Sequence, residues 1–255
     1  MRPYVLLTND DGIAAPGLYA LYHAIKEIAE VVVVAPDRER SAAGHSITIA
    51  NPLRIEKFEK NGHFMGYAVN GTPADCVKIA YFSLLDRKLD AVISGINFGS
   101  NTGINVIYSG TVSAATEGSV LSIPSFAVSL TTYENPHFET AAQFAKNFLP
   151  VLLKNELPYG VAINANVPNV PKEQVRGVKI TRQGMALYED RYEMRKDPRN
   201  HVYYWLTGSK VNIEDTLDVD DGAISKNYIS LTPIHYDLTR HDLINKMQTW
   251  DLKLE

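Results

Sequence analysis

The stretch YVLLTNDDGIAAPGLYALYHAIKEI, residues 4–28, decides the fold. It begins with a short apolar run, which predicts a strand over residues 4–8, and it ends with apolar side chains at helical spacing, which predict a helix over residues 17–28. Between them lies the polar turn NDDG, in which Asp10 and Asp11 are adjacent. In an open α/β sheet such a turn lies at the carboxyl end of a strand, where these folds bind ligands.

The same order of strand and helix continues through about the first 130 residues. Three further runs predict strands, at residues 31–35, 91–94 and 125–129. Thr72 followed by Pro73 predicts the start of a second helix, which extends to about residue 85. Strands that alternate with helices form βαβ units, so we expect an α/β fold built on a mostly parallel sheet.

An Asn-Gly pair interrupts this order. Residues 52–69, PLRIEKFEKNGHFMGYAV, alternate apolar and polar side chains on both sides of Asn61-Gly62, which predicts an inserted β-hairpin. The βαβ order resumes with a helix predicted over residues 137–153 and a strand predicted over residues 161–164.

The character of the sequence changes beyond Pro168. Three strand-like segments separated by polar, charged stretches predict an antiparallel extension from about residue 170 to 235: VRGVKITRQ, HVYYWLTGS and NYISLTPIHY. A short helix is expected over residues 238–247.

Length and composition indicate one large domain. The chain has 255 residues, 45% of them hydrophobic, and a net charge of −4. We expect a single domain over residues 1–255, with a core over about 1–168 that carries the site and an extension over about 169–255. The single cysteine excludes an intrachain disulfide, and the N-terminal residues lack the apolar stretch of a secretory signal, so we expect a cytoplasmic protein.

Charge and hydropathy indicate which classes of partner the protein lacks. No apolar run approaches the roughly 18 to 20 residues that span a membrane, and Lys and Arg are scattered without the basic block of a nucleic-acid binder. We therefore expect neither a membrane nor a nucleic acid as partner, but a small molecule.

The carboxylates of Asp10 and Asp11 predict a cation site. Asp-Gly is common turn chemistry, so a simple surface turn is the alternative. Two carboxylates about 4 Å apart repel by about 4 kcal/mol at an effective dielectric constant near 20, so a nearby cation would stabilise them. Oxygen ligands favour Mg²⁺, Mn²⁺ or Ca²⁺ over zinc. A second Asp-Asp-Gly, residues 220–222, follows no buried strand, and we expect it to be a solvent-exposed turn.

Several well-known motifs are excluded. GIAAPGLY, residues 12–19, has the glycine spacing of a Walker loop but lacks its Lys and Ser/Thr. No Gly-x-Gly occurs in the sequence, which excludes the dinucleotide fingerprint. Gly12 stands where a phosphatase with an Asp-x-Asp pair would need its second acid, which argues against an aspartyl-phosphate route. The patterns HExxH, CxxC and GxSxG are also missing from the sequence.

Two more loops leave predicted strands at the same edge. DRERSAAGHSIT, residues 37–48, supplies Ser41, whose hydroxyl suits either a turn cap or a neutral oxygen ligand. Residues 96–118 form a long loop rich in glycine and asparagine that enters a helix at SGT, residues 109–111. Free N–H groups at a helix N-terminus can hold a phosphate, although this serine also suits an ordinary N-cap. If the loops converge, they place a metal beside a phosphate.

Seven blocks of the sequence resemble, in order, the SurE family of survival proteins: NDDG with APG (9–12, 15–17), APDRERSAAGHSIT (35–48), VNGTPADCV (69–77), SGINFGSNTG (94–103), YSGTVSAATEG (108–118), NANVP (164–168) and SLTP (230–233). The resemblance spans nearly the whole chain, and the first five blocks together are highly specific. The segment between about residues 185 and 225 contributes little to it.

The resemblance implies a divalent-metal-dependent 5′-nucleotidase, a phosphatase that hydrolyses nucleoside monophosphates. It also implies a Rossmann-like core, in which helices flank a mostly parallel sheet, and a C-terminal extension that takes part in assembly of a homodimer or homotetramer. One Mg²⁺ or Mn²⁺ per subunit is implied, and Ca²⁺ could occupy the same site. The preference among 5′-nucleotides, 3′-nucleotides and short polyphosphate varies within the family.

The resemblance also implies site residues. The metal ligands would be Asp10, Asp11, Ser41 and Asn97. Beyond the resemblance, our mechanistic hypothesis is that Asp10 or Asp11 also takes a proton from the attacking water. The phosphate would be held by Ser109, Gly110 and Thr111, with Asn9 and Asn101 nearby.

Two histidines are further candidates. His45 lies in the second loop and His235 follows the SLTP block, and each could approach the site or be an ordinary solvated histidine. Two other classes of function stay open at this point. One is a non-catalytic stress protein that binds metal and nucleotide, and the other is a structural protein whose acidic loops are surface turns.

Overall fold

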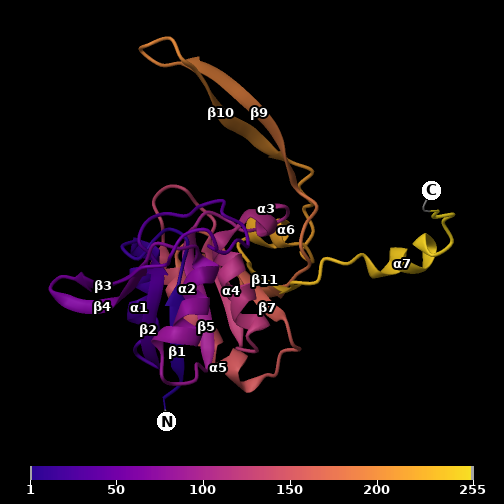
Figure 1. Ribbon diagram of the computed structural model, residues 1–255. Helices are drawn as coiled ribbons and strands as arrows, with labels where there is room; N and C mark the ends of the chain where they lie inside the picture. Colours follow the sequence, from indigo (N-terminus) through magenta and orange to yellow (C-terminus); the bar gives the residue numbers. More distant parts are fainter. Residues whose placement is uncertain (1, 254–255) are drawn as a thin grey trace.

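The computed structural model describes residues 2–253. Within these residues, a nine-stranded sheet in the order β3-β4-β2-β1-β5-β6-β7-β11-β8 forms the centre of the fold (Figure 1). Its first strands are β1 (Tyr4–Thr8), β2 (Glu30–Pro36), β5 (Ala91–Phe98) and β6 (Ser125–Leu130). Parallel pairing runs from β4 through β2, β1, β5 and β6 to β7, so the predicted mostly parallel α/β sheet is confirmed.

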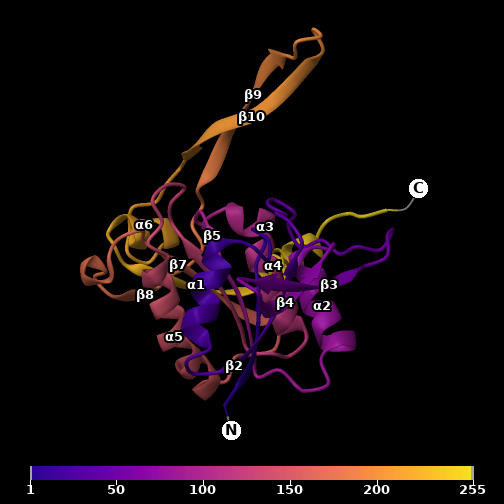
Figure 2. The same cartoon turned by 90° about the vertical axis from the view of Figure 1, so that its left-hand side faces the viewer.

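Helices cover both faces of the sheet (Figures 1 and 2). Helices α1 (Pro16–Ile25) and α5 (Phe138–Lys154) pack together on one face, and α2 (Pro73–Ile79) and α4 (Gly110–Val120) pack together on the other. Because side chains of a strand alternate between faces, Leu7 of β1 joins the apolar cluster of α1, whereas Leu6 joins that of α2. Both are fully buried, as expected for a parallel strand covered on both sides.

Local sequence explains where these helices begin. The hydroxyl of Thr72 accepts a hydrogen bond from the N–H of Asp75 at 3.1 Å, and the Asp75 carboxylate accepts one from the N–H of Thr72 at 2.9 Å. This capping box starts α2 at Pro73, and a π-helical turn (Ala80–Leu84) follows α2. Helix α1 packs closely on β5, since a Cβ added at Gly17 would lie 2.1 Å from the carbonyl oxygen of Ile96.

The predicted hairpin is confirmed as β3 (Ile55–Lys60) and β4 (His63–Val69). Asn61 and Gly62 have φ values of +54° and +75°, the left-handed conformation that this two-residue turn requires. The hairpin is also part of the main sheet, because β4 pairs in parallel with β2.

The C-terminal part is an extension of the sheet plus a long arm. β11 (Ile229–His235) pairs antiparallel with β7 (Val161–Val167), as predicted, whereas β8 (Val178–Ile180) pairs in parallel with β11. β9 (Leu187–Lys196) and β10 (Val202–Val211) form a separate antiparallel hairpin that projects from the body (Figures 1 and 2).

Some elements differ from the sequence prediction. Strand β9 was not predicted. Its sequence, LYEDRYEMRK, is rich in charged side chains, and all its residues are exposed, so it does not show the apolar side chains of a strand packed on a core. A short helix α6 (Asp220–Ser225) lies where a turn was expected, and α7 (His241–Met247) lies within the expected terminal helix. The remaining short helices are α3 (Asn105–Tyr108) and the 3-10 turn η2 (Lys172–Gln174). No helix among the described residues combines the length and the apolar character needed to cross a membrane.

Candidate active site

Three loops meet at the carboxyl ends of the neighbouring strands β2, β1 and β5. Backbone hydrogen bonds tie them together. The N–H of Arg40 in the second loop donates to the carbonyl oxygen of Asp10 in the first at 2.7 Å, and the N–H of Gly44 donates to that of Tyr108 in the third at 2.9 Å. The loops therefore form one crevice rather than three separate turns.

Asp10 lies at the base of this crevice, against the N-terminus of α4. Its side chain is almost fully buried, with 4% of the residue exposed, and the hydroxyl of Thr111 donates to its Oδ1. The approach is close, because a Cβ added at Gly110 would lie 2.7 Å from the Cβ of Asp10. Burial raises the pKa of Asp10, although hydrogen bonds from Thr111 and Gly110 act in the opposite direction.

Asp11 adds a second carboxylate next to that of Asp10. Burial, the neighbouring Asp10 and, more weakly, Glu39 raise the pKa of Asp11 to about 7, against the hydrogen bond that the N–H of Phe98 donates to its Oδ2 at 3.3 Å. Among residues 2–253, no Lys, Arg or His side chain pairs with either carboxylate. The pair of carboxylates is therefore suited to a bound cation.

Neutral oxygen donors surround the carboxylates. The hydroxyl of Ser41 donates to Oε1 of Glu39 at 2.6 Å, so its oxygen keeps lone pairs for a further partner. The amide nitrogen of Asn97 donates to the carbonyl oxygen of Gly99 at 2.7 Å, which leaves the amide oxygen as the group that can face a cation.

Asn101 is held in place by a buried polar network. Its backbone N–H donates to Oδ1 of Asn166 at 2.8 Å, and its side-chain nitrogen donates to the hydroxyl of Ser129 at 2.8 Å. Its carbonyl oxygen accepts from the side chains of Asn164 at 2.8 Å and Asn166 at 3.1 Å. The network fixes the third loop to strands β6 and β7.

These groups line a cavity of about 260 Å³. The predicted residues that line it are Asp10, Ser41, Asn97, Asn101 and Ser109, and the other lining residues are Ala42, Phe98, Ser100, Asn105, Tyr108, Tyr133 and Tyr188. Ser109 also caps α4, since its hydroxyl accepts a hydrogen bond from the N–H of Val112 at 3.0 Å. The cap and the cavity wall are thus the same residue.

The other predicted residues are not among those that line this cavity. Gly110 and Thr111 are buried against Asp10, and Asp11 contacts the backbone of Phe98. Asn9 is fully buried, and its side-chain nitrogen donates to the carbonyl oxygen of Gly12 at 2.9 Å, which shapes the turn.

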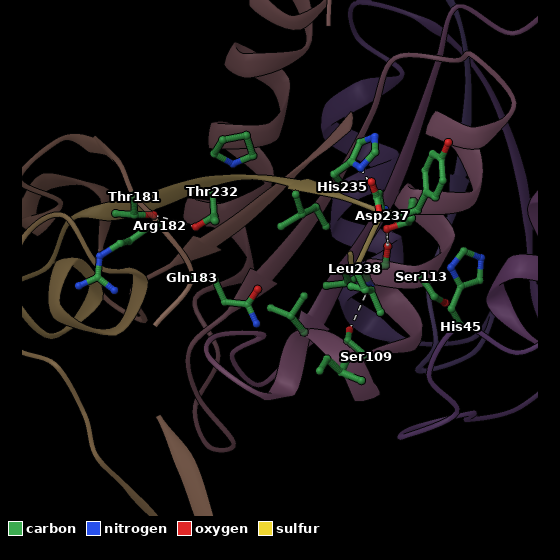
Figure 3. Close-up of a pocket in the computed structure, with 17 residues that line it drawn as sticks. His45, Ser109, Ser113, Thr181, Arg182, Gln183, Thr232, His235, Asp237 and Leu238 are labelled. Carbon is green, nitrogen blue, oxygen red and sulfur yellow. Dashed lines mark hydrogen bonds between the residues drawn. The ribbon is translucent and has the colours of Figure 1, made fainter. Parts of the chain in front are cut away.

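The two histidines lie in a different cavity, of about 680 Å³ (Figure 3). The two cavities adjoin at Ser109, which lines both of them, while Asn105 and Tyr108 of α3 line the smaller one and Val106 and Ile107 line the larger one. His45 Nε2 hydrogen-bonds with Glu117 Oε2 at 2.9 Å. His45 and His235 are therefore not among the residues that line the cavity of Asp10.

The second Asp-Asp-Gly is not the solvent-exposed turn expected from the sequence. Asp220 is fully buried and accepts hydrogen bonds from the N–H groups of Gly103 and Gly184, both at 3.0 Å. Asp221 accepts from the hydroxyl of Thr102 at 2.8 Å. The prediction was wrong because it considered only the local sequence, whereas the partners of these carboxylates come from segments distant in the chain.

The sequence analysis missed several residues of the crevice. Glu39 lies beside Ser41 and could have been found from its place in the same loop. Asn164 and Asn166, which contact the third loop, had one sequence signal, since they lie in the block NANVP. Tyr133 and Tyr188 had no local signal, because only the fold brings them to the cavity.

The donor set decides which metal could fit. Within the described part of the chain, no group of three or more His, Cys, Asp or Glu side chains is arranged to hold a metal ion. A metal at this crevice would therefore be held by two carboxylates together with hydroxyl and amide oxygens, which suits Mg²⁺ or Mn²⁺ and does not suit zinc.

The fold and this crevice define an α/β protein with an acidic, polar site at the carboxyl edge of its sheet. A sequence profile described as "Survival protein SurE" matches residues 5–190. The chain belongs to the SurE family.

Individual relatives agree over nearly full length. The chain is 50% identical to a protein named 5′-nucleotidase SurE from Syntrophobacter fumaroxidans, with 97% of this chain and 99% of the relative covered. It is 44% identical to the protein of that name from Chlorobaculum tepidum, with 99% and 96% covered. The crystal structure of Sure protein from Aquifex aeolicus superposes with a TM-score of 0.84 at 40% identity, covering 96% of this chain and 98% of the other.

Proposed function

We propose that this protein is a divalent-metal-dependent 5′-nucleotidase that hydrolyses nucleoside monophosphates to nucleoside and phosphate. The observation that supports it most is the pair of Asp10, which is buried, and Asp11, which is partly buried, without a cationic partner among the described residues and beside the N-terminus of α4. The relatives named 5′-nucleotidase SurE support the same activity. Short polyphosphate and 3′-nucleotides are further substrates to be tested.

The residues of the crevice suggest how the metal is bound. Asp10, Asp11, Ser41 and Asn97 would hold one Mg²⁺ or Mn²⁺ per subunit, and Ca²⁺ could occupy the same ligands. When bound, such an ion neutralises phosphate charge and makes a bound water more acidic.

Groups of the protein itself would bind the phosphate and accept the proton of the attacking water. Ser109, which lines the cavity at the start of α4, would bind the phosphoryl oxygens and stabilise their charge in the transition state. Gly110 and Thr111 would support it from behind, since their backbone N–H groups hydrogen-bond to Asp10. Asp10 or Asp11 would take the proton of the attacking water. The oxygen of that water then bonds to phosphorus, the bond from phosphorus to the nucleoside oxygen breaks, and the leaving oxygen takes up a proton. Asn101 and Asn9 would act by holding the two loops in place.

We also propose that residues 169–255 serve assembly into a homodimer or homotetramer. The arm and the C-terminal segment carry large apolar side chains that the single chain leaves uncovered, at Tyr192, Tyr204, Trp205 and Leu238. Light scattering on the full chain and on a variant with residues 189–209 replaced by a short turn tests this proposal. A lower oligomeric state in the variant supports it, and an unchanged state contradicts it.

The experiment that tests the function is a phosphate-release assay. Purified protein is incubated with AMP, with 3′-AMP and with tripolyphosphate, in Mn²⁺ or Mg²⁺, and in parallel with a chelator. Phosphate release from AMP that stops with chelator supports the proposed enzyme. Metal and AMP binding without release favours the nucleotide sensor, and absence of metal binding favours the structural protein.

A further inference from the structure

Four of the residues that line the candidate active-site cavity are aromatic. They come from four separate segments: Phe98 at the end of β5, Tyr108 at the end of α3, Tyr133 after β6, and Tyr188 in β9. The three tyrosines are exposed by 57%, 70% and 40%. Flat apolar side chains left open around a polar cavity are typical of a binding surface.

The size of the cavity indicates what these side chains contact. Its volume of about 260 Å³ is below the roughly 300 to 1,000 Å³ of pockets that enclose a whole small ligand. A phosphate bound at Ser109 would use part of this space, and the base of a nucleotide would extend beyond it. Two courses are open to the base, past the exposed tyrosines or into the larger cavity that also reaches Ser109, and the flat tyrosine rings favour the first.

Tyr133 and Tyr188 lie close enough to act together. The tyrosine ring of Tyr133 covers Gly99, since a Cβ added there would lie 2.7 Å from its Cε1. The side chains of Tyr133 and Tyr188 line the same cavity. The hydroxyl of Tyr188 accepts a hydrogen bond from the side chain of Asn105 at 3.4 Å.

Tyr188 belongs to the projecting hairpin, and its position depends on how the base of that hairpin is held. In the register of β9 and β10, Tyr188 pairs with Lys210, so the two side chains lie on the same face. The ammonium group of Lys210 donates to Oδ1 of Asp221 at 2.5 Å and to the hydroxyl of Thr102 at 2.7 Å.

This contact ties the hairpin to the active-site loop. Thr102 follows Asn101 directly, and its own hydroxyl donates to Asp221 Oδ1 at 2.8 Å. The side chains of Lys210 and Asp221 are only 17% and 12% exposed, so the ion pair is shielded from solvent. The second Asp-Asp-Gly thus sets the distance between the base of the hairpin and the third loop.

We propose that Tyr133 and Tyr188 bind the nucleobase of the substrate by stacking, and that Lys210, Asp221 and Thr102 are positioning residues that hold Tyr188 at the cavity. This inference rests on the proposed function. It makes the β9–β10 hairpin part of substrate recognition, and it explains why an exposed strand begins beside the active-site cavity.

The test compares AMP with ribose 5-phosphate, which has the same phosphate and sugar but no base, at saturating Mn²⁺. Loss of stacking on one aromatic ring weakens base binding about tenfold. We therefore expect Tyr188→Ala and Tyr133→Ala each to lower the AMP to ribose 5-phosphate ratio of kcat/KM about tenfold, mainly through the KM for AMP. Tyr188→Phe, which keeps the flat ring, should retain the ratio.

A control separates stacking at the cavity from the loss of any exposed aromatic ring. Phe82 is exposed by 65% in the π-helical turn Ala80–Leu84 and lines neither of the two cavities, so Phe82→Ala should leave the ratio unchanged. Turnover of ribose 5-phosphate reports whether each variant is folded, and Tyr188→Leu replaces Tyr188→Ala if the latter does not fold. An unchanged ratio in Tyr133→Ala and in a folded Tyr188 variant overturns the inference.

The positioning role has its own test. Lys210→Met removes the ion pair but keeps the aliphatic stem, and we expect it to lower the same ratio about threefold. Lys226→Met is the matched control, because Lys226 pairs with the exposed Asp215. An equal loss on both substrates in Lys210→Met contradicts positioning of Tyr188. If the wild-type protein hydrolyses neither substrate, the proposed function fails instead.

Discussion

The hydroxyl of Thr111 donates a hydrogen bond to Oδ1 of Asp10, and both residues are buried. This bond joins the first turn of α4, where we place the phosphate, to the loop where we place the metal. A change at either residue should therefore disturb both ligands at once.

Thr111→Val tests this coupling, because valine has nearly the same shape and lacks the hydroxyl. A hydrogen bond to a charged group contributes about 1.5 to 3 kcal/mol, so we expect kcat/KM for AMP to fall about 10- to 100-fold. Thr116→Val is the control, since the Thr116 hydroxyl bonds only to the carbonyl oxygen of Val112 within the helix. Wild-type kinetics in Thr111→Val would show that the bond has no role in the reaction.

Asp220 should prove to be a major source of stability. Its carboxylate accepts three backbone hydrogen bonds, from Gly103 and Gly184 at 3.0 Å and from Asp221 at 2.8 Å. Asp220→Ala leaves these buried N–H groups without acceptors, so we expect the free energy of unfolding to fall by about 3 kcal/mol in urea titrations. Asp215→Ala, at an exposed carboxylate, should cause little change, and similar losses in both variants would contradict the account.

Glu117 should make stability depend on pH on the acid side. Burial alone would raise the pKa of Glu117, but hydrogen bonds from His45 and Lys78 lower it below 4.5. The ionised form is therefore favoured by folding. Its contribution is fully present above pH 4.5 and is lost as the pH falls through the lower pKa of the folded state. Thermal melts from pH 3 to 7 should show a weaker acid-side slope in Glu117→Gln, and an identical slope would count against this pairing.

The sequence predicted those parts of the fold that depend on local pattern. Apolar runs and caps placed β1, α1, the Asn61-Gly62 hairpin and the start of α4 correctly. It did not predict β9, because LYEDRYEMRK is rich in charged side chains and has no β-branched ones, whereas the similarly exposed β10 was predicted from its aromatic and β-branched residues. The burial of Asp220 was missed for another reason, since its partners Gly103 and Gly184 are far away in sequence.

The residues of the candidate site also fall into those that the local sequence predicts and those that it does not. Residues at the ends of predicted strands, such as Asp10, Ser41 and Asn97, could be named in advance, and they line one cavity. Tyr188 could not be named, because it belongs to a hairpin whose base only the fold brings to the cavity.

The central claim is that the carboxylates of Asp10 and Asp11 hold a metal needed for phosphate release. Because burial disfavours the charged form of both, a neutral amide should be tolerated in the fold. The variant Asp11→Asn should therefore keep the circular dichroism spectrum and melting temperature of the metal-free protein, whereas Asp10→Asn also loses an acceptor for the hydrogen bonds from Thr111 and Gly110 and should melt at a lower temperature. Asp215→Asn is the control at an exposed carboxylate.

Phosphate release from AMP in Mn²⁺, measured for the wild type and for Asp11→Asn at equal protein concentration, tests this claim most directly. We expect release by the wild type that stops with chelator, and a loss of at least about 1,000-fold in the folded Asp11→Asn variant, since both metal binding and proton transfer depend on this edge of the crevice. Near-normal release by Asp11→Asn, or release by the wild type that persists with chelator, would contradict the account.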